Sequence, residues 1–242
     1  MAVMRILVTN DDGVASPALP RLAAWASKLG EVTVVAPKIE QSGKSQAIDF
    51  KNPIEIKKIT LDGGIEAWAV NSTPADCVRF GVTGLKQNYD MVFSGINRGY
   101  NLGDDVSYSG TIGAIFEASR LGIKAIAFST GVDSFDNAVN NLDNAYSYIE
   151  NNKLLETADL LNVNFPLTEI KGIRITKQGA IFYSDDFIKC GEDMYRQIGE
   201  PIDTGSTDLT IDVSAVRNGY ISITPVTANK TDFAAYEKLK TL

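Results

Sequence analysis

The stretch Arg5-Ile-Leu-Val-Thr-Asn-Asp-Asp-Gly13 joins a short apolar run to two adjacent carboxylates and a glycine. An apolar run before a glycine that permits a sharp turn is typical of a buried strand. In open α/β sheets, ligands bind beyond the carboxyl ends of the strands. Carboxylates as close as Asp11 and Asp12 repel unless a cation or an arginine lies between them. The motif is consistent with a metal site, and equally with a solvated turn or a helix cap, where Asp-Asp-Gly is common.

Strand and helix patterns alternate through the first 151 residues. Beyond the strand at residues 6–8, the patterns predict helices at residues 17–29, 111–121 and 136–151, and strands at residues 31–36, 54–59, 65–70, 91–94 and 124–129. Thr73-Pro74 starts another helix, because threonine caps it and proline needs no N–H at the first position. Repeated strand–helix–strand units predict an α/β fold with a mainly parallel sheet and helices on both faces.

The pattern changes near residue 160. Strands are expected at residues 161–165, 173–176, 209–213 and 220–226, followed by a short helix from about residue 232. Residues 182–207 are polar and contain three glycines, which predicts an excursion from the core, either an active-site flap or an oligomerisation arm. We therefore divide the chain into a core, residues 1–160, and a smaller β-rich C-terminal part, residues 161–242.

Composition excludes several classes of protein. With 242 residues, the chain can bury a substantial core. Its net charge of −7 argues against binding nucleic-acid polymers, whose affinity comes largely from Lys and Arg on phosphates. No apolar stretch reaches the roughly 18 residues of a membrane span, and the first apolar run is too short for a signal peptide, so we expect a cytoplasmic protein. Cys77 and Cys190 lack the spacing of a zinc site or a disulfide framework.

The sequence contains no histidine. Ser-His-Asp and Cys-His catalysis and His-ligated zinc are therefore impossible. Acid–base chemistry must use carboxylates, Lys, Tyr or metal-bound water. A bound metal would be a hard cation with oxygen ligands, such as Mg²⁺, Mn²⁺ or Ca²⁺.

Four polar clusters follow predicted strands, at residues 11–12, 41–45, 94–99 and 107–111, and they should meet at one edge of the sheet. Asn97 and Ser42 offer neutral oxygens that could complete a divalent-cation site with Asp11 and Asp12. Ser109-Gly-Thr-Ile-Gly113 leads into a helix, whose unpaired N–H groups and dipole suit an anion. A plain Ser/Thr cap is the alternative.

Arg98 lies within the third of these clusters and has two interpretations. It could clamp a phosphate, or it could pair with Asp104 or Asp105, and we favour the pairing. Asp104-Asp105 itself is expected to cap and hydrogen-bond a glycine-rich loop, as adjacent aspartates in turns commonly do.

The longest motif is Ser94-Gly-Ile-Asn-Arg-Gly-Tyr-Asn-Leu-Gly-Asp-Asp-Val-Ser-Tyr-Ser-Gly-Thr111. Together with residues 6–13, Val35-Ala-Pro37 with Ser42, and Thr73-Pro-Ala-Asp-Cys77, it closely resembles the survival protein SurE family, strongly over residues 5–130 and weakly beyond. That family comprises metal-dependent 5′/3′-nucleotidases, also described as acid phosphatases. The resemblance implies a Rossmann-like core and a C-terminal part that exchanges elements between protomers to form homodimers or homotetramers.

The resemblance also implies roles for individual residues. One Mg²⁺ or Mn²⁺ per subunit would be held by Asp11, Asp12, Ser42 and Asn97, and the substrate phosphate by Asn101, Ser109, Gly110 and Thr111. The chain departs from the family pattern near the serine. Gln41 stands where arginine is frequent, and Ser45-Gln46-Ala47 where Gly-His-Ser is frequent. These departures bear on nucleotide preference and turnover rather than on the metal site.

These observations together predict a phosphomonoesterase acting on nucleoside monophosphates. Asp11 and Asp12 are the expected catalytic residues, with Asp11 as general base or attacking group if metal-activated water is not the nucleophile. Two alternatives use the same sheet: an exopolyphosphatase on short polyphosphate, and a catalytically idle nucleotide sensor.

Overall fold

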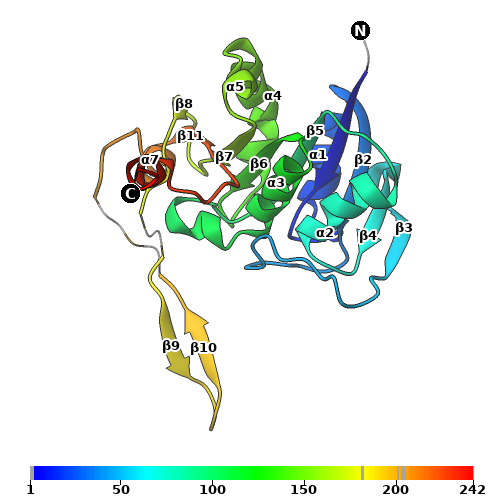
Figure 1. Cartoon of the computed structure of the whole chain (residues 1–242), viewed down its shortest axis with the longest axis horizontal. Coiled ribbons are helices and arrows are strands. Elements are labelled where there is room, and N and C mark those ends of the chain that lie inside the picture. The colour runs from blue at the N-terminus through cyan, green and yellow to red at the C-terminus, as the bar shows by residue number, and fades with distance from the viewer. Residues whose placement is uncertain (1–2, 181–182, 201, 203–204, 242) are drawn as a thin grey trace.

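One sheet of nine strands runs through the part of the chain that the computed structural model describes, residues 3–180, 183–200, 202 and 205–241. Its strand order is β3-β4-β2-β1-β5-β6-β7-β11-β8 (Figure 1). The strands are β1 Met4–Thr9, β2 Gly30–Pro37, β3 Ile56–Thr60, β4 Glu66–Val70, β5 Met91–Arg98, β6 Lys124–Thr130, β7 Leu160–Phe165, β8 Gly172–Ile175 and β11 Tyr220–Pro225. From β4 to β7 all neighbours are parallel, which confirms the predicted α/β class.

Helices cover both faces of this sheet. In β1, Ile6 and Val8 belong to a core cluster that includes α1 and α4, whereas Leu7 belongs to one that includes α2 and α3 (Figure 1). This alternation is the two-residue side-chain period of a strand. The helices are α1 Ala18–Ala26, α2 Pro74–Arg79, α3 Gly110–Arg120, α4 Asp136–Asn151, α5 Leu154–Thr157, α6 Asp212–Arg217 and α7 Phe233–Leu239.

The chain reverses its direction of travel across the sheet between β1 and β5. After β1 it proceeds outward through β2 to β4, and it then returns to β5 on the other side of β1. Adjacent crossovers therefore leave the sheet on opposite faces, so a crevice forms at the carboxyl ends of these two strands. Asp11 and Asp12 follow β1 at this point, and Asn97 and Arg98 end β5.

The strand expected at residues 209–213 is wrong. Leu209, Ile211 and Val213 alternate as in a strand, but α6 begins at Asp212, and Ile211 makes only an isolated bridge to Lys177. The Asp212 carboxylate accepts hydrogen bonds from the N–H groups of Val213, Gly103 and Gly179. These bonds hold the buried Asp212 side chain in the interior at the first residue of α6, rather than on a sheet edge.

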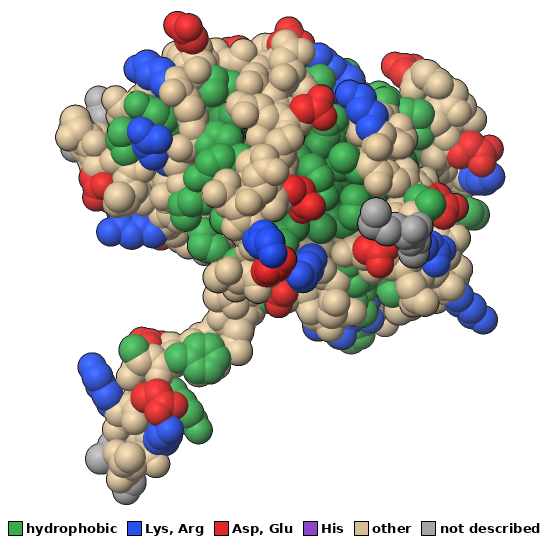
Figure 2. Space-filling view, turned by 90° about the horizontal axis from the view of Figure 1, so that it is seen from above, with side chains coloured by type: hydrophobic (Ala, Val, Ile, Leu, Met, Phe, Trp, Pro, Cys, Tyr) green, Lys and Arg blue, Asp and Glu red, His purple; other side chains and the backbone are tan. Residues whose placement is uncertain are grey.

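The excursion at residues 182–207 contains a hairpin of β9, Asp186–Lys189, and β10, Tyr195–Ile198. It stands away from the body of the molecule (Figure 1) and carries exposed apolar side chains (Figure 2). Residues 182, 201, 203 and 204 of the predicted segment lie outside the described residues. The boundary predicted at residues 160 and 161 falls inside β7, which pairs with β6, so the proposed division of the chain stays a prediction. No helix in the described ranges has the length and apolar content to cross a lipid bilayer.

We expect Trp25→Ala to lower the free energy of unfolding by about 3–5 kcal/mol, the usual cost of emptying a large aromatic site. Trp25 is 5% exposed and packs on Phe93, Phe128 and Tyr146 with ring centroids 5.3–5.9 Å apart. Urea denaturation measures the change. Phe50→Ala is the control, because Phe50 is 80% exposed and should change stability by less than about 0.5 kcal/mol. Equal effects of the two variants would contradict this assignment of the core.

Candidate functional site

A cavity of about 280 Å³ lies at the crevice between β1 and β5. Its lining comes from the segments after β1, β2 and β5, from the start of α3 and from the base of the hairpin, and it includes Asp11, Ser42, Asn97, Asn101, Ser109 and Tyr183. The structure therefore brings together residues from all four polar clusters of the sequence, although they are separated by up to about 100 positions.

Asp11 is 3% exposed and lies against the first turn of α3. The Thr111 hydroxyl donates a hydrogen bond to its Oδ1. Gly110 allows this approach, because a Cβ there would lie 2.9 Å from the Asp11 Cβ and 3.1 Å from the Gln41 carbonyl oxygen. Burial raises the pKa of Asp11, and the Thr111 bond opposes that rise without cancelling it.

Asp12 is less buried and interacts electrostatically with Asp11. Its Oδ2 accepts a hydrogen bond of 3.1 Å from the Arg98 backbone N–H. Burial, followed by the negative charge of Asp11, raises the pKa of Asp12 to about 6. Both carboxyls are therefore destabilised in the ionised form, and a divalent cation between them would relieve the burial cost and the repulsion together.

Ser42 and Asn97 supply neutral oxygens beside this pair. The Ser42 hydroxyl donates to Glu40 Oε1 at 2.7 Å, which leaves its oxygen lone pairs to act as a ligand. The Asn97 amide nitrogen donates to the Gly99 carbonyl at 2.8 Å, so Oδ1 is its remaining polar atom. A register shift between Ser94 and Asn97 in β5 re-aims Asn97 relative to the regular strand.

The donor set fits a hard divalent cation. Two carboxylates, one hydroxyl and one amide oxygen are all oxygen ligands, and their charge of −2 matches Mg²⁺ or Mn²⁺. Among the described residues no group of three or more His, Cys, Asp or Glu side chains is placed to hold a metal. Metal binding would therefore depend on Ser42, Asn97 and water to complete the coordination that the two carboxylates begin.

The start of α3 can receive an anion. Ser109 is its N-cap, and the Ser109 hydroxyl accepts a hydrogen bond of 3.2 Å from the Ile112 N–H. The cap interpretation is thus correct for this hydroxyl. It does not exclude the anion interpretation, because the hydroxyl keeps its own proton and the N–H groups of the first turn have no partners within the helix. Asn101, 5% exposed, lines the same cavity.

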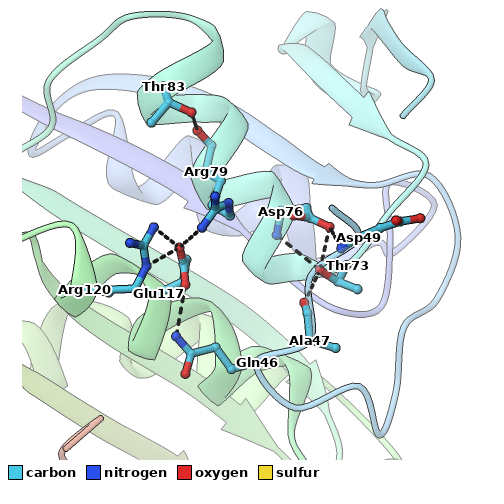
Figure 3. Close-up of polar contacts among 9 residues, drawn as sticks. All are labelled: Gln46, Ala47, Asp49, Thr73, Asp76, Arg79, Thr83, Glu117 and Arg120. Atoms are coloured by element: carbon cyan, nitrogen blue, oxygen red, sulfur yellow. Dashed lines mark hydrogen bonds and ion pairs between the residues drawn. The ribbon is translucent and has the colours of Figure 1, made fainter. Parts of the chain in front are cut away.

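Two buried carboxylates hold the loop that carries Ser42 (Figure 3). Glu117 of α3 accepts hydrogen bonds from Arg79 and Arg120 on one oxygen and from the Gln46 amide, at 3.0 Å, on the other. Asp76 of α2 accepts from the Asp49 N–H at 2.8 Å. These bonds fix the loop to α2 and α3, which cover the same face of the sheet. The anchored residues, Gln46 and Asp49, follow Ser42 in the sequence, whereas β2 precedes it.

The interaction expected for Arg98 is wrong. Its Nε donates to the Val132 carbonyl oxygen at 2.9 Å, and among the described residues no ion pair joins it to Asp104 or Asp105. The Arg98 guanidinium binds the loop after β6, because Arg98 at the end of β5 pairs with Thr130 at the end of β6. Arg98 lines the cavity, so contact with a phosphate remains open to it.

Asp105 was assigned only a capping role from the sequence, and it lies at the cavity. Its Oδ2 is buried and has no hydrogen-bond partner among the described residues. Burial, then the charges of Asp185 and Asp104, raise the pKa of Asp105. The signal available in the sequence was the position of Asp105 in the same polar segment as Asn97 and Ser109.

A larger hollow of about 710 Å³ lies between α1 and the β3–β4 hairpin. Its charged lining residues include Arg21 and Glu66, which are engaged in ion pairs with Asp136 and Lys58. The other carboxylate in its lining, Asp62, is exposed as Glu66 is, whereas Asp11 at the smaller cavity is buried.

A model of the family described as "Survival protein SurE" matches residues 6–185. The chain belongs to the SurE family.

Members of this family align with the chain over nearly the whole length of both sequences. A protein of Thermoanaerobacter sp. (strain X514) named 5'-nucleotidase SurE is 39% identical over 95% of this chain and 94% of its own. One of Serratia proteamaculans (strain 568), named 5'/3'-nucleotidase SurE, is 39% identical over 98% of this chain and 96% of its own. The crystal structure of the SurE protein from Aquifex aeolicus superposes with a TM-score of 0.82 at 34% identity, covering 98% of both chains. The family resemblance noted from the motifs is thus confirmed.

We expect Gly110→Ala to weaken Mn²⁺ binding roughly 10- to 100-fold, as displacement of a ligand's support does in metal sites. The added Cβ would displace Asp11, although alanine favours a helix more than glycine does. Isothermal titration of Mn²⁺ measures the change. Ser119→Ala on the same helix is the control and should bind as the wild type does. Unchanged Mn²⁺ binding in Gly110→Ala would contradict the role of Asp11 as a ligand.

Proposed function

We propose that this SurE-family chain is a divalent-metal-dependent phosphomonoesterase that hydrolyses nucleoside 5′- and 3′-monophosphates to nucleoside and phosphate. The observation that carries the proposal is the contact of Asp11 with the start of α3 at the β1–β5 crevice, where Asp11 is also coupled electrostatically to Asp12. The names of the relatives support the nucleotidase activity, and the name of the Serratia proteamaculans protein supports the 3′ activity.

Asp11, Asp12, Ser42 and Asn97 would hold Mg²⁺ or Mn²⁺. When bound, such a cation polarises a phosphate oxygen and offsets the charge that develops in the transition state. The Gly110 N–H at the start of α3, the Ser109 hydroxyl and the Asn101 amide would orient the phosphate oxygens, and Thr111, whose hydroxyl donates to Asp11, would hold that carboxylate beside them. Because uncatalysed phosphomonoester hydrolysis is very slow, charge neutralisation and orientation must supply most of the barrier reduction.

Proton transfer falls to carboxylates in a chain without histidine. Asp11 is our candidate for the general base or the attacking group, because it is one of the residues that would hold the metal and it also contacts the start of α3. We assign Asp105 as the group that protonates the departing nucleoside oxygen, since it lines the cavity and has an unpaired buried oxygen atom. A partly buried carboxyl of raised pKa is suited to this task.

Self-association through the hairpin is part of the proposal. Phe187, Met194 and Tyr195 are each about 60% exposed on β9 and β10 or the turn between them. A protruding hairpin with apolar side chains would gain by packing against another copy of the chain, as a homodimer or homotetramer.

Phosphate release from a panel of nucleoside monophosphates, with EDTA and then with Mn²⁺ or Mg²⁺ restored, tests the function. We expect release that stops with chelator and returns with metal, and Asp12→Asn to abolish it with the fold intact. Asp62→Asn is the control, because Asp62 is an exposed carboxylate that does not line the cavity. Nucleotide binding without release would favour the sensor, and faster release from short polyphosphate would favour the exopolyphosphatase.

The role of Asp105 predicts a dependence on the leaving group. Asp105→Asn should slow release from nucleoside monophosphates, whose alkoxide leaving group needs a proton, by roughly 10²- to 10⁴-fold. It should slow p-nitrophenyl phosphate hydrolysis far less, because the phenolate leaves without protonation. Steady-state rates on both substrates give the comparison, with Asp62→Asn again as the control. An equal loss on both substrates would rule out proton donation by Asp105.

A further inference from the structure

Buried polar side chains lie behind Asn101, at the carboxyl ends of β6 and β7. Asn162 and Asn164 of β7 and Ser129 of β6 are each 0% exposed. All six residues of β7 are buried, so the two asparagines occupy positions where the sheet would otherwise bury apolar side chains. Burying an amide side chain costs free energy unless its polar atoms are paired, and the partners of these asparagines therefore show what they do.

Asn164 pairs with both backbone polar groups of Asn101. Its Oδ1 accepts from the Asn101 N–H at 2.9 Å, and its Nδ2 donates to the Asn101 carbonyl at 3.0 Å. Two parallel hydrogen bonds from one carboxamide to one residue fix that residue's position and its orientation. The Asn164 carboxamide thus takes the place that the N–H and carbonyl groups of a neighbouring strand would take.

The remaining hydrogen bonds lock this arrangement. Asn162 donates to the same Asn101 carbonyl at 2.8 Å, and Asn164 donates to Asn162 Oδ1 at 3.1 Å, so each asparagine holds the other's rotamer. The Asn101 side-chain nitrogen donates to Ser129 Oγ at 2.8 Å. An amide nitrogen carries two hydrogens, and the second is left for a partner in the cavity that Asn101 lines.

A second anchor lies two residues further along. The Gly103 N–H donates to Asp212 Oδ2 at 2.9 Å, and a Cβ at Gly103 would lie 2.0 Å from the Ala180 carbonyl oxygen. Gly103 has φ +55°, which glycine adopts without strain. The loop between β5 and α3 is therefore fastened at residues 101 and 103 by groups from the C-terminal third of the chain.

We propose that Asn162, Asn164 and Ser129 are positioning residues for the phosphate group. They hold Asn101 so that its remaining amide hydrogen points at a phosphate oxygen beside the start of α3. This inference rests on the proposed function for the identity of the substrate. We assign the three residues no contact with the substrate; they act through Asn101. Without them, the loop that carries Asn101 would lose conformational entropy each time a phosphate binds, which would weaken binding.

The test compares three variants by isothermal titration of inorganic phosphate in the presence of Mn²⁺. Asn164→Leu removes both bonds to the Asn101 backbone, and Ser129→Ala removes only the acceptor for its side chain. Ser222→Ala is the matched control. Ser222 faces Asn164 in the β7–β11 register, is 0% exposed, and bonds Thr176 at 2.7 Å. Thermal unfolding of each variant measures the purely structural cost.

We expect phosphate to bind about tenfold more weakly to Asn164→Leu and Ser129→Ala, the loss of roughly one well-placed hydrogen bond. The KM for nucleoside monophosphates should rise with it, while Mn²⁺ affinity without phosphate stays at the wild-type value. Ser222→Ala should lose thermal stability and keep wild-type phosphate affinity.

Wild-type phosphate affinity in both Asn164→Leu and Ser129→Ala would overturn the proposal, as would an equal loss in Ser222→Ala. If Asn164→Leu fails to fold, Ser129→Ala decides, because it leaves the backbone bonds intact. Failure of the proposed function is a separate result: wild-type protein would then release no phosphate from any nucleotide, yet the phosphate-binding comparison would still test the role of the three residues. Wild-type protein that binds no phosphate would overturn the proposal.

Discussion

The contact between the Asp11 carboxylate and the first turn of α3 is the constraint on which the rest of the site depends. It requires glycine at position 110 and places a buried negative charge against the positive end of a helix. The helix end and the Thr111 hydroxyl favour the carboxylate, but burial outweighs the Thr111 bond, because the pKa of Asp11 is raised. The neighbouring protein groups therefore do not fully compensate the negative charge of Asp11. A bound cation would supply the missing compensation.

The loops around this contact are irregular, so their backbone polar groups need partners from elsewhere in the chain. Buried polar side chains provide them: Glu117 and Asp76 hold the loop after β2, and Asn164 and Asp212 hold the loop after β5. Such groups contribute little net stability compared with apolar residues of similar size. Their repeated use around one cavity indicates that the geometry of these loops, rather than the stability of the sheet, is what they maintain.

The sequence was sufficient wherever the signal was local. The helix at Asp136–Asn151 follows from apolar residues at helical spacing, and the meeting of the polar clusters follows from the parallel sheet. It was insufficient where a side chain serves a remote segment. Asp212 and Asn164 look like interruptions of apolar strands, and their partners lie 109 and 63 residues away. The bond of Arg98 to Val132 similarly depends on how the loop after β6 folds back, which no local pattern encodes.

The charge balance at the cavity links cation and substrate. Among the described residues that line it, Asp11 and Asp105 are acidic and Arg98 alone is basic. A helix terminus offers only about half a positive charge, so under the proposed function a phosphate dianion would bind well only together with a divalent cation. By linkage the phosphate must strengthen cation binding equally. Each added phosphate unit of a polyphosphate adds negative charge, which a protein of net charge −7 repels. The nucleoside of a monophosphate adds no charge. The electrostatics therefore favour the monoester over the polymer as the substrate.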